Sequence, residues 1–362
     1  MNFISHILEC EIDLKKILLN ENKFINLLKI QKTDLDVNFC AEYLFLNSFD
    51  KKDIFLIYFI LQKEKEFWVN IFYKSKIKLK NYNLGKYYDI ETPYGYGGPI
   101  SNSKSIKFLN FARINFDNWC QKKNIVCELI RFNPFLKNHQ NISNKSSIHI
   151  TRIKKLALVK DVDDISLNFF NQKTRNMIKK NSYSNINFQV YDKLNINENL
   201  LLKFYENYTN SMLIKKAKKF YFFPWNYFLY LKKLILKDNA FLVMANDITS
   251  RDYLCGAIFL KNDTNCYYHL SFQKKVAGLM NSLLFFFYNQ AKKKNIKNIM
   301  LGGGLTNDEN DTLFKFKEKM SNISLDFYIG TKIHNHKIYN RIVDYFKLTS
   351  TPSKLLFYKY ND

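Results

Sequence analysis

The alternation of apolar and polar residues predicts helices and strands mixed throughout the chain. In the first half, helical spacing predicts helices at 36–49, 53–64 and 105–123. Runs of β-branched and aromatic residues predict strands at 67–77 and 125–132. The longest apolar run, 54–61, has eight residues, whereas a spanning helix needs about 20. We therefore expect no transmembrane segment.

The second half alternates strands and helices more regularly. Three β-rich runs are spaced as an antiparallel meander, and Asn-Asp-Thr-Asn at 262–265 supplies its second turn. The predicted strands are 156–160, 187–191, 240–245, 253–261, 266–272, 296–301 and 325–329. The predicted helices are 166–180, 197–211, 225–236, 279–293, 311–320 and 335–346. A polar stretch at 136–147 places the expected domain boundary near residue 150, giving domains 1–150 and 151–362.

The composition indicates a globular protein and predicts its cellular compartment. Of the 362 residues, 47% are hydrophobic, which is ample for two packed domains. The six cysteines form no CxxC pair, so we expect reduced thiols and no metal site. The first residues include Glu9 and Glu11 and begin without a basic residue, which is unlike a signal peptide. We therefore expect a cytoplasmic protein.

The charge is strongly positive, with 56 Lys and Arg against 32 Asp and Glu and a formal net charge of +24. Such an excess favours anionic partners: nucleotides, phosphorylated lipid carriers, tRNA or an anionic membrane surface. The alternative is a solvated coat of lysines, since the lysines are spread along the whole chain. Charge alone leaves both interpretations open.

A segment rich in glycine, proline and tyrosine spans 88–99 (YDIETPYGYGGP) and predicts an ordered loop or an interrupted edge strand. Its Asp89, Glu91, Tyr94 and Tyr96 combine carboxylates with aromatic rings, which suits recognition of a sugar or an amine. The alternative interpretation is a rigid structural turn.

Three further places in the second half carry candidate chemistry. Arg175 and Lys179 lie one helical turn apart, a spacing that can grip a diphosphate or belong to an ordinary basic face. His269, on a predicted central strand, is a candidate general base or a histidine hydrogen-bonded within the sheet. Gly302, Gly303 and Gly304 follow a strand, so they allow close approach of a ligand or make a tight turn.

Five segments together resemble the Fem-like transferases of the GNAT (acetyltransferase) superfamily. They are YDIETPYGYGGP, VCELIRFNP at 126–134, KTRNMIKK at 173–180, YYHLS at 267–271, and IMLGGG with DTLFKFKEKM within 299–320. The resemblance implies an α/β fold of two tandem GNAT-like domains, each with a mixed sheet, an antiparallel meander and flanking helices. It also implies an acceptor cleft between the domains.

The activity implied by this resemblance is amide formation. An acyl or aminoacyl group would pass to an amino group on a nucleotide- or lipid-linked amino sugar or peptide precursor of the cell envelope. By match to the Fem pattern Leu-aromatic-x-Phe-Lys, Lys317 would stabilise the oxyanion or the leaving end of the donor, and Phe316 would wall the pocket. Without this match, the alternative interpretation of Lys317 is a solvated lysine on an exposed helix face. The sequence departs from the family at Met320 and Ser321.

The acyl donor is left undecided between acetyl-CoA and aminoacyl-tRNA. GNAT enzymes that use acetyl-CoA carry a glycine-containing loop before the helix that follows the meander, and its amides hold the pyrophosphate. Here 273–278 reads QKKVAG, with Val276 at the central glycine position. Two other functions stay open: an RNA-binding protein without catalysis, suggested by charge and aromatic content, and a degenerate GNAT scaffold.

Overall fold

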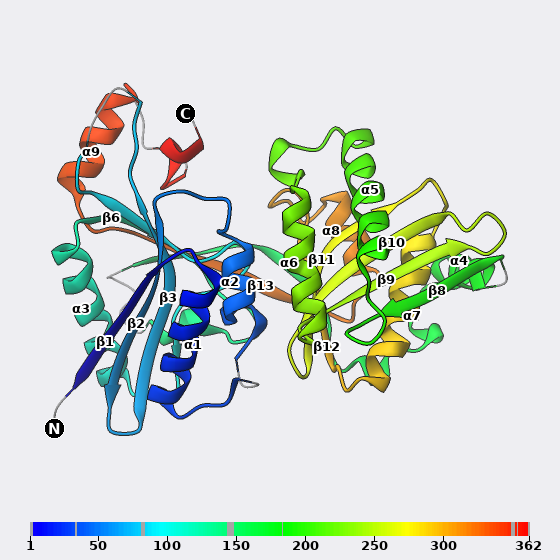
Figure 1. Ribbon diagram of the computed structural model, residues 1–362, viewed down its shortest axis with the longest axis horizontal. Helices are drawn as coiled ribbons and strands as arrows, with labels where there is room; N and C mark the ends of the chain where they lie inside the picture. The colour runs from blue at the N-terminus through cyan, green and yellow to red at the C-terminus, as the bar shows by residue number, and fades with distance from the viewer. Residues whose placement is uncertain are drawn as a thin grey trace. The chain divides into compact units, whose positions relative to one another are not determined.

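The computed structural model describes residues 3–32, 35–80, 84–142, 148–182, 184–348, 352 and 354–360 (Figure 1). The chain divides into two compact units. The first comprises Met1–Asp34, Asn38–Ile153 and Asp326–Asp362, and the second comprises Leu35–Val37 and Lys154–Leu325. The sequence-based division placed 326–362 in the second domain, whereas the structure groups this segment with the first unit. Part of the polar stretch at 136–147, residues 143–147, lies outside the described residues.

The first unit is a mixed sheet with helices on both faces. Its strands are β1 (Ile4–Glu11), β2 (Ile54–Lys63), β3 (Glu66–Lys76), β4 (Tyr88–Glu91), β5 (Ile100–Ser101), β6 (Ile125–Arg131) and the end of β13 (Ile323–Ile333). Its helices are α1 (Leu14–Leu28), α2 (Ala41–Leu46), α3 (Ile106–Lys122) and α9 (His336–Tyr345), with short 3₁₀ turns η3 (Asn138–Asn141) and η7 (Phe357–Tyr360). The strand order is β1-β2-β3-β4-β6-β13, with β5 beside β3.

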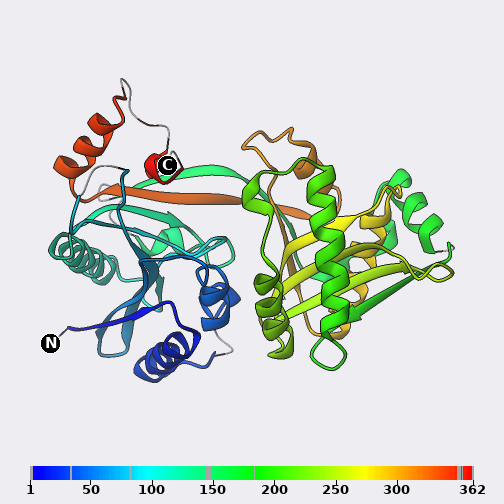
Figure 2. The ribbon, with the colours of Figure 1, turned by 45° about the horizontal axis from the view of Figure 1, so that its top comes forward.

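Alternation along β2 explains why helices cover both faces of this sheet. Tyr58 contacts Phe24 of α1, whereas its neighbour Phe59 contacts Phe116 of α3. Successive side chains of a strand point to opposite faces, so α1 and α3 lie on opposite sides of the sheet. Figure 2 shows the two helices separated by the strands.

The helix predicted at 53–64 is wrong, because this segment is strand β2. Its eight-residue apolar run lacks alternation since both faces are buried, and such a run does not distinguish a buried strand from a buried helix. The antiparallel partners β1 and β3 on either side complete its hydrogen bonds. The helix predicted at 36–49 shrinks to α2 and the 3₁₀ turn η2 (Val37–Phe39).

The second unit is a sheet in the order β7-β12-β11-β10-β9-β8. Its strands are β7 (His149–Val159, which begins in the first unit), β8 (Ile186–Tyr191), β9 (Ala240–Asp247), β10 (Tyr253–Lys261), β11 (Asn265–Gln273), β12 (Asn298–Gly302) and the start of β13. Its helices are α4 (Gln172–Ser182), α5 (Glu198–Ile214), α6 (Trp225–Leu236), α7 (Leu279–Lys293) and α8 (Thr312–Glu318), with short turns η4 (Val162–Asp164), η5 (Leu167–Phe169) and η6 (Lys219–Tyr221). The predicted antiparallel meander of β9, β10 and β11 is confirmed.

Helices cover both faces of the second sheet as well. Figure 1 shows α5 and α6 in front of the strands, and α7 lies behind them. Phe204 of α5 contacts Phe272 of β11, and Phe287 of α7 stacks on Phe259 of β10 at 3.9 Å between ring centroids. An α/β architecture with a mixed sheet, an antiparallel meander and flanking helices is therefore confirmed. In the described parts of the chain, no helix has the length and hydropathy required to cross a membrane.

Candidate functional site

The candidate site of the second unit is the point where β11 and β12 separate, which we call the mouth of these two strands. The two strands pair in parallel over three residues only, from Asn265 with Asn298 to Tyr267 with Met300. β11 then continues to Gln273, whereas β12 ends at Gly302 and turns away. Beyond Tyr267 and Met300, the two strands no longer pair with each other.

Lys317 lies at this mouth, on α8. Its side chain is 9% exposed, so the interpretation of Lys317 as a solvated lysine is wrong. Its Nζ donates to the Gly303 carbonyl at 2.9 Å and sits 5.7 Å from the centroid of the Tyr268 ring of β11. The ammonium therefore lies between the loop after β12 and the Tyr268 ring of β11. Phe316 is half-buried and packs against the core of the second unit.

The electrostatic environment of Lys317 is unusual because its hydrogen-bond partner is a neutral group. Burial and, to a smaller extent, the charge of nearby Lys154 together lower the pKa of Lys317 to about 8. Lys154 itself, on β7, donates to the carbonyls of Gly304 and Thr306. Two lysines thus converge on backbone carbonyls of the loop that follows β12.

Gly302 ends β12, and Gly303 and Gly304 begin the loop between β12 and α8. Gly302 has φ of +82°, a conformation that favours glycine. A Cβ at Gly304 would lie 2.3 Å from Oδ1 of Asp311, so only glycine fits against that side chain. Asp311 in turn accepts hydrogen bonds from the backbone of Leu313 and Phe314, at 2.9 and 3.0 Å, and begins α8. The loop and the helix that carries Lys317 are therefore held in one arrangement.

His269 points to the other face of the sheet. Its neighbour Tyr268 faces Lys317, and strand alternation directs His269 toward α6, where its Nε2 lies 2.6 Å from the hydroxyl of Tyr227. Burial lowers the pKa of His269 to about 4, so the imidazole is neutral at pH 7. The structure does not bring His269 and Lys317 together, and its geometry favours a hydrogen-bonded histidine within the fold.

The N-terminus of α7 is occupied by side chains of the protein itself. The Gln273 carboxamide oxygen accepts from the backbone N–H of Met280, and its Nε2 donates to the Val276 carbonyl. Met177 of α4 packs so closely on Gly278 that a Cβ there would lie 2.7 Å from the Met177 Cβ. These contacts satisfy the Met280 N–H and cover Gly278 at the start of α7.

Arg175 and Lys179 share α4, and the structure gives them different environments. The Arg175 guanidinium donates to the Phe170 carbonyl and to Oε1 of Gln172, both at 2.6 Å, and so braces the turn before α4. Lys179 is exposed. Arg175 thus has a structural role, and a diphosphate grip by the pair stays a prediction.

Asp89 and Glu91 both lie on β4 and face the C-terminal turn η7. The Tyr358 hydroxyl donates to Asp89 at 2.8 Å, and burial raises the pKa of Asp89 to about 6. Burial also opposes ionisation of Glu91, but Lys359 and Arg131 outweigh it and hold its pKa at about 2. Sequence reasoning missed Tyr358 and Lys359 because they lie some 270 residues away, and no local pattern signals the pairing.

Tyr94 and Tyr96 lie in the loop after β4 but are directed differently. The backbone carbonyl of Tyr94 accepts from the Tyr43 hydroxyl at 2.7 Å, and its side chain is 43% exposed. The Tyr96 ring packs edge-on against Phe327. The loop is therefore anchored, as expected of a rigid turn, and ligand recognition by its tyrosines stays a prediction.

A second charged cluster is buried in the first unit. Asp117 of α3, Glu128 of β6 and His334 present oxygen and nitrogen atoms within 4.8 Å of one another, a spacing that metals use. Arg113 donates to both carboxylates, at 2.6 Å to Asp117 and 2.5 Å to Glu128. Lys332 pairs with Asp117 at 2.7 Å. Two cations already neutralise the two carboxylates, so the cluster is suited to holding α3 on the sheet and unsuited to a metal ion.

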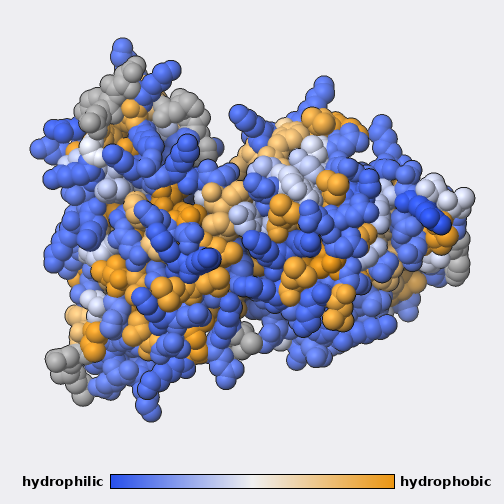
Figure 3. Space-filling view, in the orientation of Figure 1, coloured by the Kyte–Doolittle hydropathy of each residue, from blue (hydrophilic) through white to orange (hydrophobic). Residues whose placement is uncertain are grey.

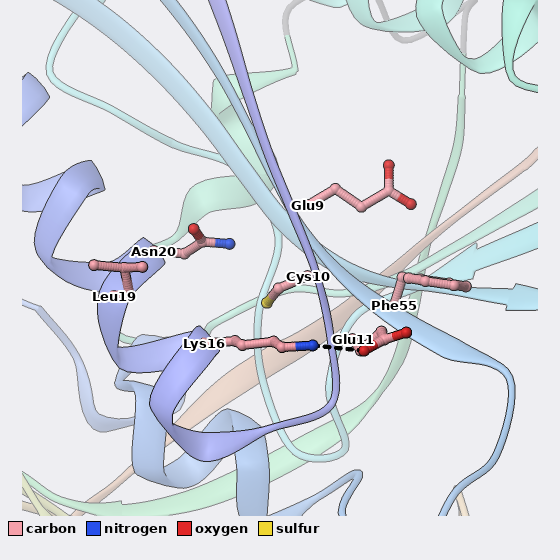
Figure 4. A pocket seen from close by; sticks show the side chains of 7 residues that line it. All are labelled: Glu9, Cys10, Glu11, Lys16, Leu19, Asn20 and Phe55. Atoms are coloured by element: carbon pink, nitrogen blue, oxygen red, sulfur yellow. Dashed lines mark hydrogen bonds and ion pairs between the residues drawn. The ribbon is translucent and has the colours of Figure 1, made fainter.

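A hollow of about 470 Å³ opens beside β1 and α1 in the first unit (Figure 4). It is lined by Glu9, Cys10, Glu11, Lys16, Leu19, Asn20 and Phe55. Lys16 pairs with Glu11 at 2.6 Å, and burial raises the pKa of Cys10 to about 11, so this thiol is not a nucleophile near pH 7. The predicted site residues lie elsewhere.

Comparisons with known proteins identify the fold. No family model and no curated protein matches the sequence. Among solved structures, FemX is 11% identical with a TM-score of 0.64, covering 92% of this chain and 99% of that chain. L-PGS from Bacillus licheniformis is 13% identical with a TM-score of 0.57, covering 94% and 98%. A tandem GNAT protein from the clavulanic acid biosynthesis pathway is 6% identical with a TM-score of 0.51, covering 92% and 99%. The fold of Fem-like tandem GNAT proteins is thereby confirmed.

Proposed function

We propose that this protein, which has the fold of Fem-like tandem GNAT proteins, is an N-acyltransferase. It moves an acyl or aminoacyl group to an amino group on a nucleotide- or lipid-linked amino sugar or peptide precursor of the cell envelope. The observation that carries the proposal is the buried ammonium of Lys317 at the point where β11 and β12 separate.

Lys317 supplies the positive charge that the reaction needs. The acceptor amine attacks the donor carbonyl, a C–N bond forms, and negative charge develops on the carbonyl oxygen. When this intermediate collapses, the bond from the carbonyl carbon to the leaving oxygen or sulfur breaks, and that leaving atom ends with the proton that the amine loses. An ammonium held in a site of low dielectric stabilises such an oxyanion, and one donor of this kind contributes about 3 to 4 kcal/mol. With a pKa of about 8, Lys317 is mostly protonated at pH 7.

The environment of α7 supports an aminoacyl-tRNA donor over acetyl-CoA. Gln273 and Met177 occupy the helix N-terminus where a coenzyme A pyrophosphate would bind. Among the proteins of similar fold is a putative lysylphosphatidylglycerol synthetase, whose name describes an aminoacylated product. The excess of 24 positive charges suits a polyanionic donor such as tRNA.

Mass spectrometry tests the proposal. The purified protein is incubated with acetyl-CoA in one arm and with charged tRNA in another, against nucleotide-linked amino sugars and lipid-linked peptide precursors. We expect a gain of one amino-acid residue in the tRNA arm. A gain of one acetyl group in the acetyl-CoA arm would contradict the choice of donor. If neither arm gives a gain in mass, the proposed transferase activity is wrong.

Two variants on α8 distinguish the loss of the Lys317 ammonium from the loss of any one positive charge. Lys317→Met removes the buried ammonium, whereas Lys315→Met removes an exposed lysine two residues away that pairs with Glu318 at 3.4 Å. We expect transfer to slow by about 10² to 10³ in the first variant and to persist in the second. Equal activity in both folded variants would contradict the role of Lys317.

A further inference from the structure

The segment that joins α5 to α6 has a distinct charge. From 207 to 237, the sequence holds seven lysines and no aspartate or glutamate. Four of these lysines, at 215, 216, 218 and 219, fall within five residues between the two helices. This is a local concentration of positive charge without acidic residues.

Large apolar side chains are exposed among these lysines. Leu213, Ile214 and Phe220 are 60%, 67% and 55% exposed. In Figure 3, hydrophobic surface lies beside hydrophilic projections at the upper edge of the second unit, where Figure 1 draws the loop between α5 and α6. We call residues 213–220, the last two residues of α5 and the segment that follows them, the basic-apolar loop.

The basic-apolar loop is held by a layer of aromatic side chains. The Tyr208 hydroxyl of α5 donates to the Tyr221 carbonyl at 2.8 Å. Phe220 contacts Tyr221 and Phe223, at 5.4 and 6.3 Å between ring centroids. The apolar side chains are thus presented on an ordered base, so displaying them costs little further conformational entropy on binding.

Lysines beside exposed apolar and aromatic side chains match the chemistry of an anionic lipid surface. Each lysine near such a surface is attracted to the headgroups, and apolar side chains can enter the acyl boundary. RNA would engage the lysines and stack on rings, but it offers no apolar surface for Leu213 and Ile214. The observations therefore favour a membrane over a nucleic acid.

We propose that the basic-apolar loop docks the second unit on an anionic membrane surface, with Leu213, Ile214 and Phe220 inserted and the four lysines at the headgroups. Figures 1 and 2 both place this loop at the same end of the second unit as the loop after β12, which carries the exposed Leu305. Docking there would bring the mouth of β11 and β12 toward lipid-linked molecules. The inference stands independently of the transferase activity.

Vesicle binding of the full chain tests the inference. The protein is sedimented with vesicles of phosphatidylglycerol and phosphatidylcholine, and separately with phosphatidylcholine alone. We expect binding to the anionic vesicles only, weakened by salt because surface charges are screened. Equal binding to both kinds of vesicle, or to neither, would overturn the inference.

Two triple variants with equal charge changes localise the surface. Lys218→Glu, Lys219→Glu, Phe220→Ser alters the basic-apolar loop. Lys104→Glu, Lys107→Glu, Ile106→Ser is its control, because Ile106 is 67% exposed between two exposed lysines of the first unit. We expect the loop variant to lose affinity for anionic vesicles about tenfold or more while the control changes little. Equal losses would assign binding to overall charge and contradict docking through the loop.

Tryptophan fluorescence provides a direct readout of insertion. Of the three tryptophans, Trp68 and Trp119 are buried in the first unit, whereas the half-buried Trp225 begins α6 beside the loop. Brominated anionic lipids should therefore quench emission from wild type and not from Trp225→Phe. If the loop variant instead loses affinity for RNA while vesicles leave Trp225 emission unchanged, the surface is an RNA site and the membrane inference is wrong.

Discussion

The two units each bury a cation, but they surround it in opposite ways. In the first unit, Arg113 is paired with Asp117 and Glu128, and these carboxylates overcome the effect of burial and raise the pKa of Arg113. In the second unit, Lys317 donates to a backbone carbonyl and lies beside Tyr268, and burial lowers its pKa to about 8. The first arrangement is complete without a ligand. The second gains favourable interactions when an anion or a developing negative charge arrives.

The largest expected effect comes from breaking the balanced cluster. Arg113→Met leaves Glu128 buried without its main partner, which should lower the free energy of unfolding by roughly 3 to 5 kcal/mol. Urea denaturation measures this change. Removing both charges, as in Arg113→Met with Glu128→Leu, should restore much of the stability. Unchanged stability in the single variant would contradict the structural role of the cluster.

The unbalanced cation should affect catalysis more than folding. Lys317→Met is expected to lower kcat for transfer by about 10² to 10³, the usual cost of losing one oxyanion donor. Single-turnover assays with charged tRNA measure the rate. Lys317→Arg, which keeps a cation, should recover part of it. A folded Lys317→Met with normal kcat would remove the distinction between the two clusters.

Stability against pH should reveal the lowered pKa of Lys317. The group binds a proton less tightly in the folded state than at its ordinary pKa of 10.5, so stability rises with pH between about 8 and 10.5. Relative to Lys317→Met, the wild type should gain on the order of 2 to 3 kcal/mol across that window. Paired urea titrations at pH 7.5 and 10.5 measure the difference. A constant difference would show that the Lys317 pKa is normal.

His269 should give the smallest effect, at acid pH. Its pKa of about 4 lies below the ordinary 6.5, so the unfolded chain binds more protons between these values and stability falls as pH falls. Relative to His269→Gln, the wild type should lose on the order of 1 to 3 kcal/mol between pH 6.5 and 4. Thermal melts across this range test the sign. A folded His269→Gln whose transfer rate drops more than tenfold would place His269 in the catalytic set.

Local patterns predicted the second unit better than the first. The helices at 225–236 and 279–293 match α6 and α7, because each has one buried stripe with 3.6-residue spacing. Strand β1 was missed and β2 was predicted as a helix, since β2 is buried on both faces and its periodicity disappears. Long-range pairing, which decides between strand and helix there, has no local signal.

The candidate site shows the same limit. The resemblance to Fem-like proteins pointed to Lys317, and its burial and contact with Gly303 came only from the fold. The sequence did not predict that His269, the neighbour of Tyr268 in the chain, points to the face of the sheet opposite Lys317. Gln273 at the start of α7 also went unrecognised as a cap, because its partner Met280 lies seven residues away across a turn.

The return of the chain to the first unit has a consequence for its synthesis. The Asp89 and Glu91 carboxylates are translated 269 and 268 residues before their partners Tyr358 and Lys359. At about 5 to 20 residues per second, the ribosome takes roughly 13 to 54 s to make that interval. Residues 154–325, which make up nearly all of the second unit, are synthesised during this interval, whereas the first unit still lacks the end of strand β13 and the turn η7. The unit that contains the first strand is therefore the one whose residues are completed last.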